Sequence, residues 1–89
     1  MTEKQKRSIR QRIGRAIAKF RREHHQDVAY HSLIAGDTVH VFTVAAGGDN
    51  VSWAKEPMAY VFCSLAPICK QDGRDSHCCG HVDSKFVLL

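Results

Sequence analysis

The chain of 89 residues has an ordinary globular composition, with 44% hydrophobic and 25% charged residues, and a formal net charge of +4. This length supports one modest hydrophobic core, so we expect a single domain over residues 1–89. No apolar run approaches the roughly 20 residues of a membrane-spanning helix, and the first residues are charged instead of forming an apolar signal segment. We therefore exclude a membrane-spanning protein and predict a cytoplasmic one.

The positive charge is concentrated at the N-terminal end of the chain. Residues 1–23 contain nine of the thirteen Lys and Arg residues and only two acidic residues, Glu3 and Glu23. The rest of the chain carries more acidic than basic residues. This distribution predicts a basic segment attached to a mildly acidic body.

The basic segment is predicted to form one amphipathic helix from about residue 2 to residue 24. Thr2 followed three residues later by Gln5 fits a capping box, which satisfies two backbone donors at a helix start. Gly14 lies inside the helix at a cost of about 1 kcal/mol relative to alanine, so we expect compensating packing or a close neighbour there. Apolar residues recur at spacings of three and four, on one face of such a helix. They are Ile9, Ile13, Ala16, Ile17 and Phe20.

A β-rich region is predicted from about residue 28 to residue 89. Residues 28–34 and 38–44 are rich in β-branched and aromatic side chains and flank a tight-turn signal at Gly36, so they predict a β-hairpin. The remaining elements follow from the same rules of composition and turn chemistry. They are a loop over residues 46–50, an edge strand over 51–54, a long strand over 58–65, a loop over 70–75 and a final strand over 85–89.

Together these elements predict an α+β fold. In its simplest form, the N-terminal basic amphipathic helix packs on one face of a small antiparallel sheet of three to five strands. The apolar side of the helix is then buried against the sheet, and its cations face outward or lie along the rim.

The cations of the helix are the main functional signal. Nine cations raise the local electrostatic potential and favour a phosphate backbone or an acidic protein surface, whereas a helix used only for solubility usually mixes charges. We therefore predict a small non-catalytic binding or regulatory protein that engages an acidic macromolecular partner, either nucleic acid or a nucleoprotein complex. The residues predicted to contact it are Arg7, Arg10, Arg12, Arg15, Lys19 and Arg22.

An alternative function uses the same cations against a protein. Compact inhibitors or regulators of the phage or mobile-element type bind a host protein machine, and no base-reading motif in this chain separates that case from DNA or RNA binding. A basic amphipathic helix can also lie on an anionic membrane. The apolar side of this helix is narrow, has Phe20 as its single aromatic residue and is needed for packing, so we expect no membrane partner.

Cysteine and histidine residues near the C-terminal end form a candidate zinc site, which makes a small zinc-binding module a further alternative. Zinc prefers thiolate and imidazole ligands, and alternate residues of an extended chain project to one side. The candidate ligands are Cys69, His77, Cys79 and His81. Because no Cys-x2-Cys knuckle is present, the same residues also fit free thiols and unligated histidines. We predict no cofactor, or one structural zinc ion.

The sequence does not predict an enzyme. Cys78 or Cys79 beside His77 or His81 supplies a thiol and a base, but neighbouring residues on an extended chain point apart. The chain contains no glycine-rich phosphate loop, no serine elbow and no metalloprotease motif.

Overall fold

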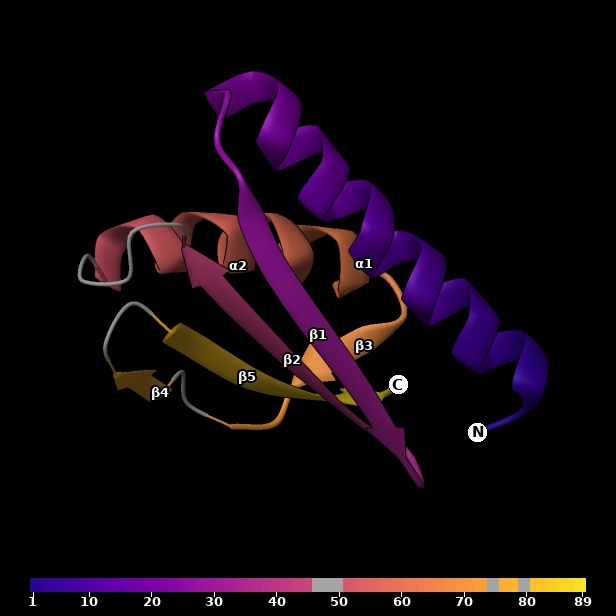
Figure 1. Ribbon diagram of the computed structural model, residues 1–89. Helices are drawn as coiled ribbons and strands as arrows, with labels where there is room; N and C mark the ends of the chain where they lie inside the picture. The colour runs from indigo at the N-terminus through magenta and orange to yellow at the C-terminus, as the bar shows by residue number, and fades with distance from the viewer. Residues whose placement is uncertain (46–50, 74–75, 79–80) are drawn as a thin grey trace.

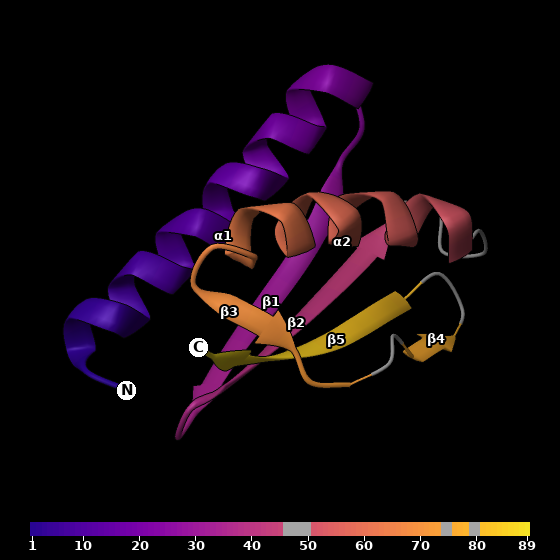
Figure 2. The same cartoon turned by 180° about the vertical axis from the view of Figure 1, so that it is seen from behind.

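The computed structural model describes residues 1–45, 51–73, 76–78 and 81–89, and the side chains of residues 1–44, 56–73 and 82–89. Over these residues the elements follow the order α1-β1-β2-α2-β3-β4-β5. Both helices lie on one face of an antiparallel sheet (Figures 1 and 2). The prediction of an α+β fold with a long N-terminal helix and a small antiparallel sheet is confirmed.

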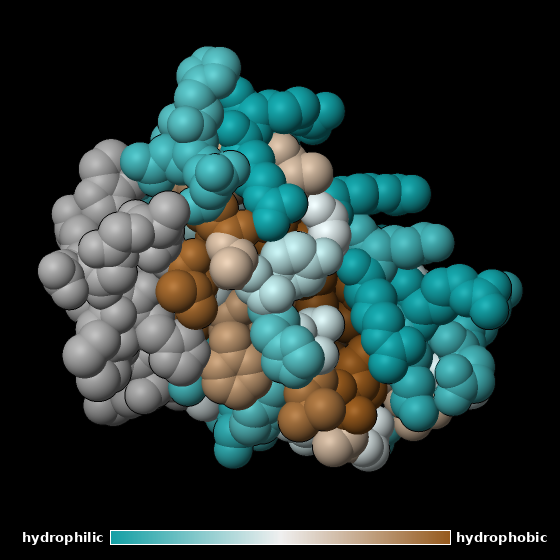
Figure 3. Space-filling view, viewed as in Figure 1, coloured by the Kyte–Doolittle hydropathy of each residue, from teal (hydrophilic) through white to brown (hydrophobic). Residues whose placement is uncertain are grey.

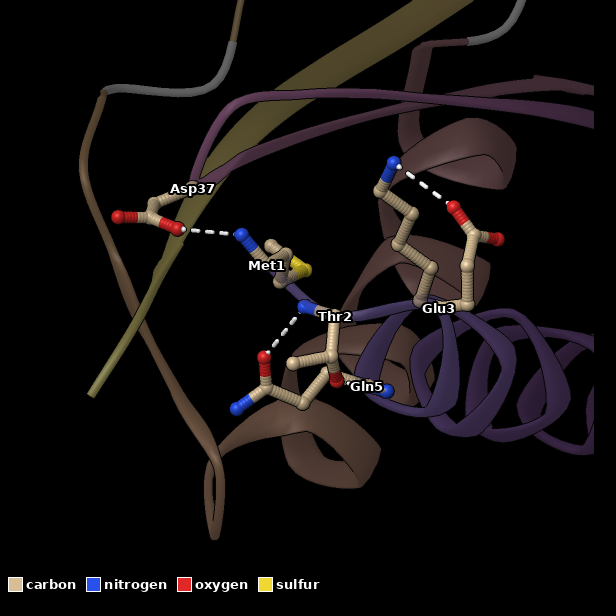
Figure 4. Close-up of polar contacts among 6 residues, drawn as sticks. Met1, Thr2, Glu3, Gln5 and Asp37 are labelled. Atoms are coloured by element: carbon tan, nitrogen blue, oxygen red, sulfur yellow. Dashed lines mark hydrogen bonds and ion pairs between the residues drawn. The ribbon is translucent and has the colours of Figure 1, made fainter.

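Helix α1 spans Glu3–His24, as the sequence predicts. Its start is a capping box: the backbone nitrogen of Gln5 donates to Oγ1 of Thr2 at 3.1 Å, and the backbone nitrogen of Thr2 donates to Oε1 of Gln5 at 2.8 Å (Figure 4). The helix ends at His25, whose φ of 51° lies in the left-handed region that commonly terminates helices. Local capping signals therefore fix both ends of α1.

Strands β1 (Val28–Ala35) and β2 (Thr38–Ala45) form the predicted antiparallel hairpin. Their two-residue turn is made by Gly36 and Asp37, and Gly36 has a φ of 61°, which side-chain-bearing residues rarely adopt. The amino nitrogen of Met1 lies 3.1 Å from Oδ1 of Asp37 (Figure 4). The hairpin turn therefore lies beside the start of α1.

The prediction of strands over residues 51–54 and 58–65 is wrong, because helix α2 occupies Val51–Leu65. Pro57 lies inside this helix and is buried, although proline cannot donate a helical hydrogen bond. The other buried residues of the described part of α2 recur at spacings of three and four, as one face of a helix requires. They are Met58, Val61 and Leu65. The predicted β-rich region thus contains a helix.

Three further strands complete the sheet: β3 (Cys69–Gln71), β4 (Ser76–Cys78) and β5 (His81–Leu88). The strand order is β1-β2-β5-β3, and β4 also pairs with β5. The predicted final strand is confirmed and begins earlier than residue 85. The predicted loop over residues 70–75 is wrong at its first two residues, which belong to β3, and the predicted loop over residues 46–50 lies outside the described residues.

The core lies between the helices and the sheet. Helix α2 covers β2 and β5, while α1 packs mainly against α2 and reaches the sheet at β1 (Figures 1 and 2). The expected packing of α1 on the sheet is therefore partial: α1 approaches β1 most closely, and its apolar residues join a core shared with α2 and the central strands. The largest fully buried side chains are Phe20 and Phe86. Among the described helices, none combines the length and apolar character needed to cross a membrane.

Gly14 has a close neighbour on the sheet side of α1. A Cβ added at position 14 would lie 3.4 Å from the hydroxyl of Tyr30, whose partly exposed side chain can shift. We expect Gly14→Ala to raise the free energy of unfolding by about 0.5–1 kcal/mol, because alanine favours the helix and restricts the unfolded chain. Urea unfolding measures the change. Gly36→Ala is the contrasting variant and should destabilise the protein by about 1–2 kcal/mol through its positive φ. Destabilisation by Gly14→Ala would show that Tyr30 is held rigidly against the helix.

Candidate binding surface

The exposed side of α1 carries most of the cations predicted to contact a partner. Five of the six predicted contact residues have exposed side chains, and Arg12 does not. The five are Arg7, Arg10, Arg15, Lys19 and Arg22. Hydrophilic side chains project along the course of α1 in the space-filling view (Figure 3). Since the apolar side of the helix is at most 6% exposed, the helix is held against the protein and presents its cations from fixed backbone positions.

Arg12 lies on the side of α1 that faces α2. Its Nη1 donates to the carbonyl oxygen of Ser64 at 3.1 Å, and Oγ of Ser64 donates to the carbonyl oxygen of Arg12 at 3.0 Å. Ser64 belongs to the last turn of α2, where helix carbonyls lack intrahelical partners and a cation is favourable. Arg12 is therefore half-buried and hydrogen-bonded to α2, whereas the other predicted contact residues have exposed side chains.

An open groove lies beside Arg15 and Lys19, between α1 and α2. Its volume is about 540 Å³. The residues that line it come from both helices: Arg15, Ala16, Lys19, Ala59, Tyr60, Cys63 and Ser64. A smaller hollow of about 270 Å³ lies on the other side of α2 and shares Ala59 and Cys63 with the groove.

From Pro57 to its end, the outward side of α2 is uncharged and mostly apolar. Residues 57–69 contain no Asp, Glu, Lys, Arg or His. Among them Ala59, Phe62, Cys63 and Ala66 are exposed, and 43% of the Phe62 side chain is accessible. The cationic side of α1 and the uncharged residues 57–65 of α2 thus form the two walls of the groove.

A cluster of polar side chains lies where the end of α1 meets α2. The hydroxyl of Tyr60 donates to the carboxylate of Glu23, and Nε2 of His24 lies 3.2 Å from the same hydroxyl. Nδ1 of His24 lies 3.9 Å from Oε2 of Glu56. The His24 ring stacks on Phe20 with ring centroids 4.4 Å apart. Two carboxylates therefore lie close to this end of the groove.

The hydrogen bond to Glu23 raises the pKa of Tyr60 above its ordinary value of 10.0, and burial and the charges of Glu23 and Glu56 act in the same direction. We expect Glu23→Gln to lower this pKa toward 10.0, because an amide still accepts the hydrogen bond but carries no charge. Ultraviolet titration in a Tyr30→Phe background reports Tyr60 alone, since the chain has two tyrosines. An unchanged pKa in Glu23→Gln would contradict the contact.

The raised pKa of Tyr60 has a consequence for stability at high pH. Because the folded protein holds the phenol proton more tightly than the unfolded chain, the stabilisation is fully present below pH 10 and is lost as the pH rises through the folded pKa. Glu23→Gln should therefore lose less stability than the unaltered protein between neutral pH and the folded pKa, as measured by urea unfolding at several pH values.

Cys69, a predicted zinc ligand, lies in the core. It is 3% exposed and pairs in register with Leu88, at the opposite end of β5 from His81. Burial raises the pKa of the Cys69 thiol, and the charge of Arg12 partly opposes this effect. The structure thus separates Cys69 from His81 along the strand and disfavours its thiolate form.

The other predicted zinc ligands lie around β4 and β5. His77 pairs in register with Val82, so the backbones of His77 and His81 lie near each other at the β4–β5 pairing. Cys79 lies outside the described residues. In the part of the chain that the structure describes, no three His, Cys, Asp or Glu side chains form a group that could hold a metal ion. The zinc site stays a prediction.

The face of the sheet away from the helices is open. Hydrophobic residues gather over it in the space-filling view (Figure 3). Leu33 and Val44 are 55% and 41% exposed, and the ring of Phe42 lies between those of His31 and His40, at centroid distances of 6.2 and 6.3 Å. This face is a second exposed apolar surface, separated from the cationic side of α1.

The α2 side of the groove does not follow from the strand that the sequence predicts over residues 58–65. A strand would place Ala59 and Cys63 on the same side as Val61 and Leu65. The helical spacing of Met58, Val61 and Leu65 is the signal that would have identified the exposed face.

Comparison with protein-family models gives no match to this chain, and comparison with curated protein sequences gives none either.

Proposed function

We propose that this chain is a small cytoplasmic, non-catalytic binding protein that engages an acidic macromolecular partner through the exposed cations of α1. One observation carries the proposal: the apolar side of α1 is buried while five of its six predicted contact cations are exposed. Their charge is therefore available to a partner. Arg12 is assigned to the packing of α1 on α2 instead.

The spacing of the exposed cations supports one contact surface. Arg15, Lys19 and Arg22 follow one another at intervals of four and three, so they share a side of α1. A nucleic acid or an acidic protein surface that meets this side contacts several charges at once. Such contacts release counterions from a polyphosphate and give binding that depends steeply on salt.

A second candidate function is a protein-directed inhibitor or regulator. It is favoured by the groove beside Arg15 and Lys19, since the α2 wall of this groove is uncharged and apolar. Interfaces with proteins combine an apolar centre with a polar rim, whereas interfaces with nucleic acids are more polar and more positively charged.

Binding measured by fluorescence anisotropy tests the proposed function. The probes are labelled single-stranded DNA, duplex DNA, RNA and polyglutamate at low salt. We expect at least one polyanion to bind, with an affinity that falls as salt rises, by a log–log slope of about −0.9 per phosphate contacted for duplex DNA. The double variant Arg15→Glu, Lys19→Glu should bind at least about tenfold more weakly.

The matched control carries the same change in net charge on the open face of the sheet. Lys70 and Lys85 are exposed on β3 and β5, and Lys70→Glu, Lys85→Glu also reverses two cations. We expect this control to retain most of the affinity. Equal losses in the two variants would attribute binding to overall charge, and the absence of binding to every probe at low salt would overturn the proposed function.

A further inference from the structure

The groove between α1 and α2 has defined ends. Reciprocal hydrogen bonds between Arg12 and Ser64 join the helices at one end. At the other end, Tyr60 donates to the carboxylate of Glu23 and lies beside His24. Between these two contacts the groove is open and has a volume of about 540 Å³. This volume falls within the range of about 300–1,000 Å³ that is typical of ligand sites.

The charge around the groove is one-sided. Arg15 and Lys19 stand on the α1 side, separated by one helical turn. The α2 side presents the small apolar side chain of Ala59 and the thiol of Cys63, and Ala16 lies between the helices. A ligand that fills the groove therefore needs an apolar group for its centre and anionic groups along one edge only.

A nucleic acid fits this arrangement less well than a protein segment. A strand lying in the groove would meet Arg15 and Lys19 on its α1 side, whereas residues 56–65, the part of α2 whose side chains the structure describes, supply no cation. At the far end its phosphates would meet the carboxylates of Glu23 and Glu56, which repel them. A peptide varies its charge from residue to residue, so it can place a neutral or basic residue at that end.

We propose that the α1–α2 groove binds a short acidic segment of a protein, with an aliphatic or aromatic side chain seated against Ala16 and Ala59 and carboxylates paired with Arg15 and Lys19. The residue of the segment that lies near Glu23 and Glu56 is neutral or basic. This inference rests on the proposed function and names the class of partner. Buried apolar anchors supply most of the affinity in such interfaces, while the charged rim supplies specificity.

Selection from a displayed library of random short peptides tests the inference. The unaltered protein is compared with Ala59→Gln, which places a longer side chain in the groove, and with Ala18→Gln, the same change at an exposed position of α1 outside the groove. We expect the selected peptides to combine acidic residues with one apolar anchor. Their affinity should fall about tenfold in Ala59→Gln and stay unchanged in Ala18→Gln.

Circular dichroism and urea unfolding establish that each variant is folded. Cys63→Gln is a second variant of the groove, at an exposed position, and should weaken peptide binding as Ala59→Gln does. Selected peptides without acidic residues, or peptides that bind Ala59→Gln as tightly as the unaltered protein, would overturn the inference. So would an oligonucleotide that binds more tightly than the peptides and loses affinity in Ala59→Gln. In each of these cases the proposed function is still supported if a polyanion binds in a salt-dependent way and this binding is lost in the double variant Arg15→Glu, Lys19→Glu. If no anionic probe binds at low salt, the proposed function itself fails.

Discussion

Replacing Phe20 by alanine is expected to lower the free energy of unfolding by about 3–5 kcal/mol, a large share of the roughly 5–15 kcal/mol that stabilises a domain. The Phe20 side chain is 0% exposed. Its ring stacks on His24 and meets the Tyr60 ring edge-on, with centroids 5.4 Å apart. Truncation removes these contacts and leaves a cavity where α1 packs on α2, and both helices are too well anchored elsewhere to close it fully.

Urea unfolding monitored by circular dichroism measures the loss, and the chain supplies a matched control. Phe62→Ala is the same chemical change on α2, but 43% of the Phe62 side chain is exposed, so we expect a loss of about 1 kcal/mol or less. Phe20→Leu should fall between the two alanine variants, because leucine fills part of the cavity. Equal losses for Phe20→Ala and Phe62→Ala would contradict the packing of α1 on α2.

Helix α1 and the β1–β2 hairpin were predicted correctly because their signals are local. The apolar spacing of three and four, the capping box of Thr2 and Gln5, and the turn at Gly36 each act over a few residues. Such signals specify the local structure without contacts from distant parts of the chain. The same holds for the exposure of Arg15 and Lys19, which follows from their place outside the apolar stripe.

Helix α2 was not predicted because its amino-acid composition favours a strand, whereas its packing in the folded protein favours a helix. Its valine, phenylalanine and tyrosine residues are typical of strands, and Pro57 interrupts the helical pattern. In the folded protein, Met58, Val61 and Leu65 are all buried. In a helix these three residues lie on one side and can be buried together. Burial on one side is needed here because this segment packs against both α1 and the central strands. Tertiary packing therefore overrides local preference here.

The groove could not be predicted from the sequence because it depends on two elements that are distant in the chain. Arg15 and Ala59 line the same groove only when α1 and α2 pack together. For the same reason, the sequence treats Arg12 and Arg15 alike as exposed cations. The two arginines differ because the guanidinium of Arg12 donates a hydrogen bond to the carbonyl oxygen of Ser64, which belongs to α2.

Replacing Arg12 by methionine is expected to lower the free energy of unfolding by about 1–2 kcal/mol. A hydrogen bond from a charged donor contributes about 1.5–3 kcal/mol when buried, and because Arg12 is only partly buried the expected effect extends from the low end of that range to somewhat below it. Methionine keeps the apolar stem of the side chain but leaves the Ser64 carbonyl without its donor at the C-terminal end of α2. Urea unfolding measures the loss.

Arg15→Met is the matched control, and we expect it to weaken binding while leaving the stability nearly unchanged. Arg15 is exposed, so its replacement should change the free energy of unfolding by no more than about 0.5 kcal/mol, yet it should weaken binding to an anionic probe. Arg12→Met should weaken folding and leave binding nearly unchanged once the variant is folded. If Arg12→Met instead preserved stability and weakened binding as Arg15→Met does, Arg12 would belong to the contact surface and its hydrogen bond to Ser64 would not hold the two helices together. The two arginines lie three residues apart on one helix, and we expect their variants to distinguish a residue that stabilises the fold from one that belongs to the proposed contact surface.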